Sequence, residues 1–188
     1  MSEVLVLGIG GAGCQLASKL HERLEVRAVA VNTDPEGLKH CGLQEQVLLD
    51  ARAVTPGFQG NCAVRENAAE VVREAFLALV DEAEILVVTA GMGGVAGTQL
   101  APLVVEYARA RNMPVIAAVT LPFGFEGERR RELAMAGLSR LTRSADEMVV
   151  LDHAEEYKRA AKGSLVDYFE AVAETVAEQV GYRLHLLQ

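Results

Sequence analysis

Two glycine-rich turns are the segments of this chain best suited to hold a ligand. Residues 8–13 (GIGGAG) and residues 91–98 (GMGGVAGT) each follow an apolar run and open a helical pattern. Glycine has no side chain, so backbone N–H groups come close to a ligand, and a helix N-terminus adds partial positive charge. Two such turns in one small chain predict a single anion, most simply a phosphate chain, held from two sides.

The first turn matches GxGxxG after an apolar run, and Asp34 follows the second run. This is the fingerprint of a dinucleotide-binding domain in which the acid binds a ribose, and a tight strand-to-helix turn without a ligand is the less favoured alternative. The second turn disfavours a dehydrogenase, because that fold needs only one phosphate turn. Thr98 caps the next helix or reaches a phosphate oxygen, and Pro102 is tolerated if it lies in a first turn. A close crossing near the sheet centre is the alternative for these glycines.

Residues 122–131 combine a carboxylate with three consecutive arginines at the start of a helical pattern. Cations there oppose the helix dipole, and a bound phosphate would remove that conflict. Glu126 beside such a phosphate suits the two hydroxyls of a ribose. We expect the outer two arginines to form a solvated basic face with neighbouring glutamates (Arg129 and Arg131 with Glu128 and Glu132).

Alternating elements must position these residues. Six short apolar runs are rich in β-branched residues and predict strands covered on both sides: residues 4–7, 28–31, 47–49, 85–89, 115–119 and 148–151. Helical patterns fill residues 14–23, 63–80, 99–111, 127–143 and 164–187. The alternation predicts an α/β fold, a doubly wound and mainly parallel six-stranded sheet with helices on both faces. Ligand is expected at the carboxyl ends of the strands.

Composition narrows the function classes. The 188 residues carry a formal net charge of −8, which disfavours nucleic-acid binding. Three cysteines without CxxC spacing favour a reducing compartment, and no cluster of metal ligands is visible. The strand pattern begins almost at once, and no apolar stretch reaches a membrane span. We expect a cytoplasmic protein with one domain, residues 1–188, that ends with the long helix 164–187.

The ordered motifs resemble the nucleotide-binding domain of FtsZ, the bacterial relative of tubulin. The match runs along the whole chain through the first glycine turn and residues 30–34, 61–68, 89–94, 122–127 and 164–167. The resemblance therefore implies the fold expected above, here of the tubulin/FtsZ type.

The resemblance also implies roles for individual residues. A first group would surround the phosphates: Gly10, Gly11, Gly13, Gly93, Gly94, Gly97 and Thr98. Gly60 and Asn61 would close over the terminal phosphate, and Arg130 would approach the phosphate end. Glu126 would hold the ribose. Asp167 would accept from the guanine N1 and exocyclic amine, which adenine lacks, and His153 stands at the family's base-contacting position.

FtsZ relatives bind GTP or GDP, usually with Mg²⁺, and assemble head to tail into filaments. Hydrolysis there needs acidic residues from the activating domain of the next subunit. Relatives that lack this second domain act at membranes or division sites only through partners. By resemblance, the partners of this chain are a guanine nucleotide and either further copies of itself or another protein.

Three departures from the family pattern change the expectation. The tubulin signature GGGTGTG is replaced at three positions, by Val95, Ala96 and Gln99, and a histidine replaces the base-contacting asparagine. Val95 restricts the backbone and Gln99 adds bulk beside the phosphates. The chain also ends near the point where FtsZ's central helix would lead to the activating domain. We therefore expect weak or partner-dependent hydrolysis.

The last helical pattern has two contrasting sides. An apolar stripe at helical spacing is formed by Leu165, Phe169, Val172, Val176, Val180 and Leu184. An acidic ridge of Glu170, Glu174 and Glu178 on the other side indicates solvent. In FtsZ the corresponding helix lies between two domains, so the ridge fits a protein without the second one.

Three functions remain open from the sequence. The first is a guanine-nucleotide-binding protein that controls self-assembly or a partner. The second is a nucleotide-free scaffold of the same fold, and the third is an NAD-type oxidoreductase. Cys14, beside the first glycine turn, is either a thiol with a lowered pKa or a small packing residue, and we favour packing.

Overall fold

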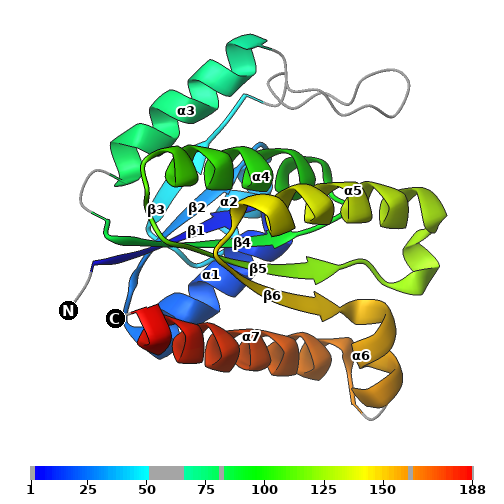
Figure 1. Ribbon diagram of the computed structural model, residues 1–188. Helices are drawn as coiled ribbons and strands as arrows, with labels where there is room; N and C mark the ends of the chain where they lie inside the picture. Colours follow the sequence, from blue (N-terminus) through cyan, green and yellow to red (C-terminus); the bar gives the residue numbers. More distant parts are fainter. Residues whose placement is uncertain (1–2, 51–65, 81–82, 161–162, 188) are drawn as a thin grey trace.

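The central sheet has six strands, and every pair of neighbouring strands is parallel (Figure 1). This computed structural model describes residues 3–50, 66–80, 83–160 and 163–187. The strands are β1 (Val4–Ile9), β2 (Arg27–Asn32), β3 (Glu45–Leu48), β4 (Ile85–Gly91), β5 (Val115–Leu121) and β6 (Glu147–Asp152). Their order is β3-β2-β1-β4-β5-β6. This arrangement confirms the doubly wound α/β fold.

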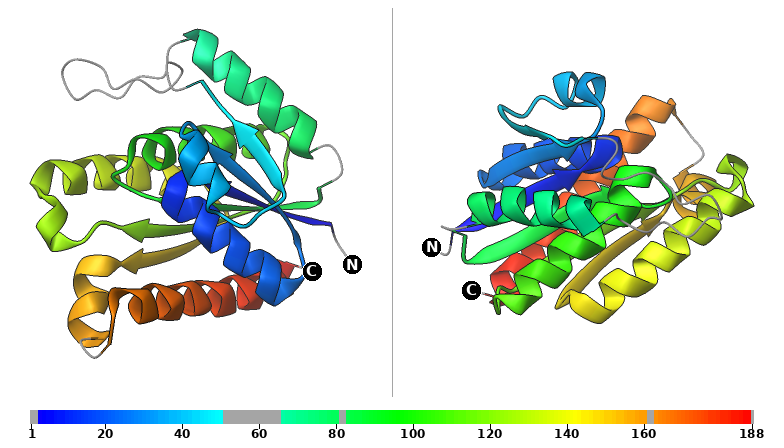
Figure 2. Two further views of the ribbon diagram at one scale, coloured as in Figure 1. Left: turned by 180° about the vertical axis from the view of Figure 1, so that it is seen from behind. Right: turned by 90° about the horizontal axis from the view of Figure 1, so that it is seen from above.

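Helices cover both faces of the sheet (Figure 2). The five longest are α1 (Gly10–Leu24), α3 (Glu66–Val80), α4 (Val95–Ala110), α5 (Glu128–Ser144) and α7 (Leu165–Leu187). Shorter pieces are α2 (Pro35–Lys39), the 3₁₀ turn η2 (Gly124–Glu126) and α6 (His153–Ala160). Buried residues of α3, α4 and α5 pack on one face, and those of α1, α2 and α7 pack on the other.

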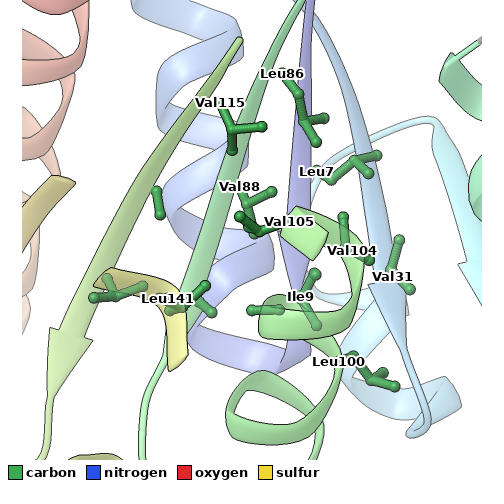
Figure 3. Packing of buried hydrophobic residues seen from close by; sticks show 14 of the residues in the cluster. Leu7, Ile9, Val31, Leu86, Val88, Leu100, Val104, Val105, Val115 and Leu141 are labelled. Atoms are coloured by element: carbon green, nitrogen blue, oxygen red, sulfur yellow. The ribbon is translucent and has the colours of Figure 1, made fainter. Parts of the chain in front are cut away.

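Alternation along the central strands produces two separate apolar layers. In β1, Leu5, Leu7 and Ile9 belong to the layer under α4, whereas Val4 and Val6 belong to the layer under α1. Figure 3 shows the first layer, in which Leu100, Val104 and Val105 of α4 meet the strands. Successive side chains of a strand point to opposite faces, so a strand covered on both sides must be apolar throughout.

The outer strand β3 departs from that expectation. Three of its four residues are exposed and only Val47 is half-buried. An edge strand has a neighbour on one side only, and charged side chains such as Glu45 there discourage pairing with another chain.

Helices α1 and α4 begin earlier than their apolar patterns predict. Both start inside the glycine turns, at Gly10 and Val95. Pro102 therefore lies in the interior of α4, and the prediction that it occupies the first turn is wrong. Since proline has no N–H, the carbonyl of Thr98 loses its usual partner four residues on.

The stripe of α7 is buried only along its C-terminal two thirds. Val172, Val176, Val180 and Leu184 are buried, whereas Leu165 and Phe169 are 51% and 43% exposed. These two residues line the cavity described below, at the carboxyl ends of the strands.

The acidic ridge of α7 is only partly a solvent face. Glu170 and Glu178 are exposed, but Glu174 pairs with Lys19 at 2.8 Å and with Arg23 at 2.9 Å, both on α1. The ridge thus also joins two neighbouring helices. No helix within the described ranges has the length and apolar character needed to cross a bilayer.

Candidate functional site

The two glycine turns lie against each other because β1 and β4 are neighbours. Ile9 pairs with Ala90 at the carboxyl ends of these strands. A Cβ built on Gly10 would lie 3.4 Å from the backbone nitrogen of Gly97, and one on Gly91 would lie 2.8 Å from the Cβ of Ala12. The N-termini of α1 and α4 consequently open side by side.

A cavity of about 690 Å³ lies at this edge of the sheet. Its volume falls in the range of pockets that enclose a small-molecule ligand. It is lined by Ile9, Gly10, Gly11, Ala12, Asn32, Thr33, Asp34, Gly37, Gly91, Met92, Gly94, Val95, Ala96, Gly97, Thr120, Leu121, Pro122, Phe123, Phe125, Glu126, Arg130, His153, Leu165 and Phe169. Of the predicted ligand residues, seven are on this lining: Gly10, Gly11, Gly94, Gly97, Glu126, Arg130 and His153.

Both helix N-termini at the cavity suit an anion. Among the described residues, no side chain caps α1 at Ile9 or α4 at Gly94, and neither first turn contains an acid. The first N–H groups of a helix have no partner within the helix, and they carry its positive dipole end. A Cβ on Gly11 would meet nothing within 4 Å, so open space lies beside this backbone. The arrangement can bind phosphate oxygens.

Three other predicted phosphate ligands instead hold the turns together. A Cβ on Gly13 would lie 2.3 Å from the carbonyl oxygen of Thr89, so Gly13 allows α1 to pack against β4. The hydroxyl of Thr98 accepts a hydrogen bond from the Gly93 N–H at 2.7 Å. None of the three lines the cavity, and their placement indicates bracing of the ligand-facing glycines.

Gly93 also positions Arg130. Its φ is +91°, and a Cβ there would lie 2.8 Å from the Cγ and the carbonyl oxygen of Arg130. The Arg130 guanidinium, half exposed at the cavity, pairs with Glu126 at 2.9 Å. The other oxygen of Glu126 accepts from the Phe123 N–H at 2.8 Å. At the charged end of the cavity, Arg130 and Glu126 thus form an ion pair, and the backbone N–H of Phe123 holds the carboxylate in place.

Arg131 has a different partner from the one expected. It donates in a fork to Asp152, with 2.8 Å between Nη1 and Oδ1, and this bond lowers the pKa of that carboxyl. Asp152 in turn accepts from the Ala154 N–H at the start of α6. The expectation of a solvated face paired with Glu128 and Glu132 is therefore wrong for Arg131. The bridge fixes the beginning of α6, where His153 lies.

An aromatic cluster forms one end of the cavity. It consists of Phe123, Phe125, His153, Tyr168 and Phe169. Phe123 stacks on His153 with centroids 4.6 Å apart and on Phe125 with centroids 4.9 Å apart. Flat rings beside a cavity can stack on a planar ligand such as a nucleobase. The cluster was not predicted from the sequence, since its members come from three separate segments.

His153 has a defined environment within that cluster. It is buried, and its Nδ1 lies 2.8 Å from the hydroxyl of Tyr168. Burial lowers the pKa of its imidazole, against the opposing influence of the carboxylates of Glu126 and Asp152. His153 is therefore neutral at pH 7. A neutral imidazole can stack on other rings, and it donates a hydrogen bond from one nitrogen and accepts one at the other.

Asp167 does not line the cavity. Its carboxylate accepts from the N–H and the hydroxyl of Ser164, both at 2.9 Å, and the Ser164 hydroxyl accepts from the Asp167 N–H. These reciprocal bonds form a capping box at the start of α7. The structure thus gives Asp167 a capping contact and does not bring it to the other predicted site residues. Gly60 and Asn61 lie outside the described residues.

The polar residues after β2 were missed as cavity residues, apart from Asp34. Asn32 accepts from the Thr33 N–H at 2.8 Å, and Asp34 caps α2 by accepting from the Glu36 N–H at 3.1 Å. The signal available in the sequence was their position directly after a strand, at the ligand-binding edge of a parallel sheet.

The residues that depart from the family signature have separate locations. Val95 lines the cavity and is 46% exposed, so it places a branched apolar side chain at the mouth. Gln99 is buried in α4 and does not line the cavity, so the expectation that its bulk lies beside the phosphates is wrong.

Cys14 is a packing residue, as favoured above. It is buried and its thiol contacts the carbonyl oxygen of Gly8 at 3.2 Å. Burial raises its pKa to about 12, which removes thiolate reactivity near neutral pH. Within the described ranges, no group of three or more His, Cys, Asp or Glu side chains is arranged to hold a metal.

The two roles of glycine in the first turn can be separated by substitution. Gly13→Ala should lower the free energy of unfolding by about 1–3 kcal/mol, because the new Cβ overlaps the β4 backbone. Gly11→Ala, two residues away and facing open space, should change it by less than about 0.5 kcal/mol. Urea denaturation measures both, and equal losses would contradict the assignment.

The lowered pKa of His153 predicts a pH dependence of stability. The folded protein favours the neutral form of the His153 ring. The resulting contribution to the free energy of unfolding is complete above the ordinary histidine pKa of 6.5, and it is lost as the pH falls toward the lower pKa of the folded state. Between about pH 7.5 and about pH 5.5, the free energy of unfolding should fall more in the wild type than in His153→Asn. Parallel slopes for the two proteins would refute this contribution.

Comparison with known proteins places the chain in a family. The Tubulin/FtsZ family, GTPase domain, matches residues 3–159. The cell division protein FtsZ of Wigglesworthia glossinidia brevipalpis is 32% identical over 182 residues, which cover 94% of this chain and 47% of that protein. FtsZ 2 of Rhizobium meliloti is 34% identical over 177 residues, covering 89% and 49%. The chain thus spans about half the length of these relatives.

Solved structures agree with this match. An empty FtsZ dimer from M. jannaschii superimposes with a TM-score of 0.76 and 27% identity, covering 96% of this chain and 53% of that chain. A GDP-bound monomer of CetZ1 from Haloferax volcanii gives 0.74 and 23%, covering 94% and 58%, and shares the fold. With its parallel sheet and paired glycine turns, this chain belongs to the Tubulin/FtsZ family and has the fold of its GTPase domain.

Proposed function

We propose that this domain binds GTP or GDP in the cavity between α1 and α4 and uses the nucleotide to control assembly. The observation that carries the proposal is the contact of two helix N-termini, neither capped by a described side chain, at one cavity. The phosphates would lie on the N–H groups of Gly10, Gly11, Gly94 and Gly97. The match to the GTPase domain of the family, and a GDP-bound protein with the same fold, support a guanine nucleotide as the ligand.

The charged pair and the aromatic cluster divide the rest of the nucleotide. Glu126 is held in place by the Phe123 N–H and would accept from ribose hydroxyls, while Arg130 would turn from Glu126 toward a phosphate. The base would stack at the aromatic cluster, beside His153 and the half-exposed Phe169. Family membership leaves no support for the NAD-type oxidoreductase.

Mg²⁺ would be held mainly by phosphate oxygens and water, which is its usual mode in nucleotide sites. When bound, it neutralises phosphate charge. Two carboxylates, Asp34 and Glu126, line the described part of the cavity: both oxygens of Glu126 already have partners, whereas Asp34 accepts a backbone N–H on Oδ1. The residues present fit an ion delivered with the nucleotide better than a preformed metal centre.

We infer weak or partner-dependent hydrolysis from the same two carboxylates. A general base for attack by water needs a free acceptor within hydrogen-bond reach. Glu126 is bonded through both oxygens, to the Phe123 N–H and to Arg130, and Asp34 holds the start of α2 through Oδ1. Along the described lining, activation would come from another chain, either a second copy or a protein partner.

The domain would act in the cytoplasm and reach membranes only through such partners.

A nucleotide-free scaffold is the second candidate, and Val95 is the observation that favours it. Its side chain stands at the cavity mouth with nearly half its surface exposed. Desolvating charged phosphate oxygens against an apolar group lowers affinity. Assembly would then proceed without nucleotide.

A direct binding experiment separates these candidates. Bound small molecules are released with acid from the purified protein and identified, and GTP, GDP, ATP and NAD are then titrated. Guanine nucleotide with a Kd of about 1–100 μM, and sedimentation that changes with GTP, would support the proposal. No binding at millimolar nucleotide would refute the proposal and favour the scaffold.

Arg130 offers a sharper prediction for the phosphate end. Arg130→Ala should weaken GTP binding by about 10–100-fold, the loss expected for a charged hydrogen bond, without affecting guanosine. Arg129→Ala removes the same charge from the neighbouring exposed position and serves as the control, which should bind as the wild type does. Calorimetric titration of both variants measures the difference. Equal affinities of the two variants would exclude Arg130 from the site.

A substitution at Asp167 tests its predicted contact with the base. In the structure this carboxylate belongs to a capping box. Asp167→Ala should lower the Tm because α7 loses the carboxylate half of its capping box, and it should leave the ratio of GTP to ATP affinity unchanged. A lost preference for guanine would show instead that this carboxylate reaches the base when nucleotide binds.

A further inference from the structure

The hydrogen bond between Tyr168 and His153 is buried within the aromatic cluster. The two side chains are 6% and 7% exposed, and 2.8 Å separates the hydroxyl from Nδ1. Tyr168 comes from the first turn of α7 and His153 from the first residue of α6. The bond therefore joins two helix starts at the cavity.

Which partner donates this hydrogen bond follows from the protons that the two side chains carry. A phenol has one proton, and burial raises the pKa of Tyr168 to about 12, so it stays protonated. Among the described residues, Nδ1 of His153 is the acceptor found for this hydroxyl. If Nδ1–H donated instead, the buried phenol proton would have no partner. The hydroxyl consequently donates to Nδ1, and the neutral imidazole carries its proton on Nε2.

The ring of His153 has one edge left for a ligand. Phe123 stacks on one face with an interplanar angle of 10°, and Tyr168 occupies the Nδ1 edge. His153 also lines both the main cavity and a hollow of about 60 Å³ that continues it between α1 and α7. Phe169 packs perpendicular to the ring with centroids 5.6 Å apart. Since Tyr168 holds Nδ1, Nε2 is the ring nitrogen that a ligand in this space would contact.

We propose that Tyr168 is a positioning residue that locks His153 as an Nε2–H donor, and that this donor reads an acceptor on the purine base. This inference rests on the proposed nucleotide site. At its sixth position guanine has a carbonyl oxygen, which accepts, whereas adenine has an amino group, which donates. A histidine fixed as a donor favours the first and opposes the second. An asparagine at this place offers both a donor and an acceptor and would lack that restriction.

The first test observes the tautomer in the nucleotide-free protein. Long-range proton–nitrogen NMR spectra of the histidine rings distinguish protonated from bare nitrogens, and the His153→Asn variant assigns the signals. We expect Nε2 of His153 to be protonated and Nδ1 bare in the wild type. In Tyr168→Phe, which keeps the ring and removes the hydroxyl, the two tautomers should both appear. A protonated Nδ1 in the wild type would overturn the positioning role.

The second test measures base preference. Tyr168→Phe should lower the ratio of GTP to ATP affinity by roughly fivefold, the size expected for one neutral hydrogen bond. In a His153→Asn background the same substitution should change nothing, because its effect passes through the histidine. Tyr157→Phe is the matched control: this ring packs edge-on against Phe123 and Tyr168 without lining the cavity.

The outcomes separate the two proposals. An unchanged ratio in Tyr168→Phe, at an unchanged Tm, would refute base reading even if GTP binds well. If the wild type binds no nucleotide, the proposed function fails together with base reading, whereas the tautomer spectrum still decides the role of Tyr168. An equal change in Tyr157→Phe would show a general effect of packing among these rings and would likewise overturn the proposal.

Discussion

The parallel pairing of β1 with β4 is the constraint on which the site depends. In the strand order found here, these two central strands lie side by side, and their following helices lie on opposite faces of the sheet. The connections that leave β1 and β4 therefore run to opposite faces of the sheet, and a crevice remains between them at the carboxyl ends of the two strands. Two helix N-termini reach that crevice only because the backbones approach closely, which Gly13 and Gly97 allow by lacking a Cβ.

The glycines of the two turns consequently have two physical roles. Some, such as Gly11, leave open space for a ligand, and others, such as Gly13 and Gly93, let a second backbone approach. Both roles need the same residue type, which explains why the family resemblance assigned Gly13 and Gly93 to the phosphates together with Gly11. Gly93 links the roles, since its contact with Arg130 positions a charged side chain at the cavity. Substitutions in these turns can therefore impair binding through the fold.

Contacts with nearby residues determine the hydrogen-bond partners of most polar side chains that the sequence had assigned to a ligand or to solvent. Asp34 and Asp167 each bond to a backbone N–H two or three residues away, at the start of a helix. Arg131 instead bonds across to Asp152, a residue of the neighbouring strand β6. In each case the motif identified a chemically capable side chain, and the local backbone or the neighbouring strand determined its partner. The sequence could not weigh these competing partners because they depend on helix boundaries and strand order.

By itself the sequence determined the strands, the longer helices, the doubly wound class and the family, since apolar patterning and the order of short motifs are properties of the linear chain. It also predicted that two glycine turns share one site. Tertiary structure alone decided that Gly13 and Thr98 brace the turns, that Gln99 lies away from the cavity, and that Val95 faces it. It likewise assembled the aromatic cluster from residues far apart in the chain. The physical reason is that side-chain neighbours across a sheet follow from strand order and helix packing, which leave no periodic trace in the sequence.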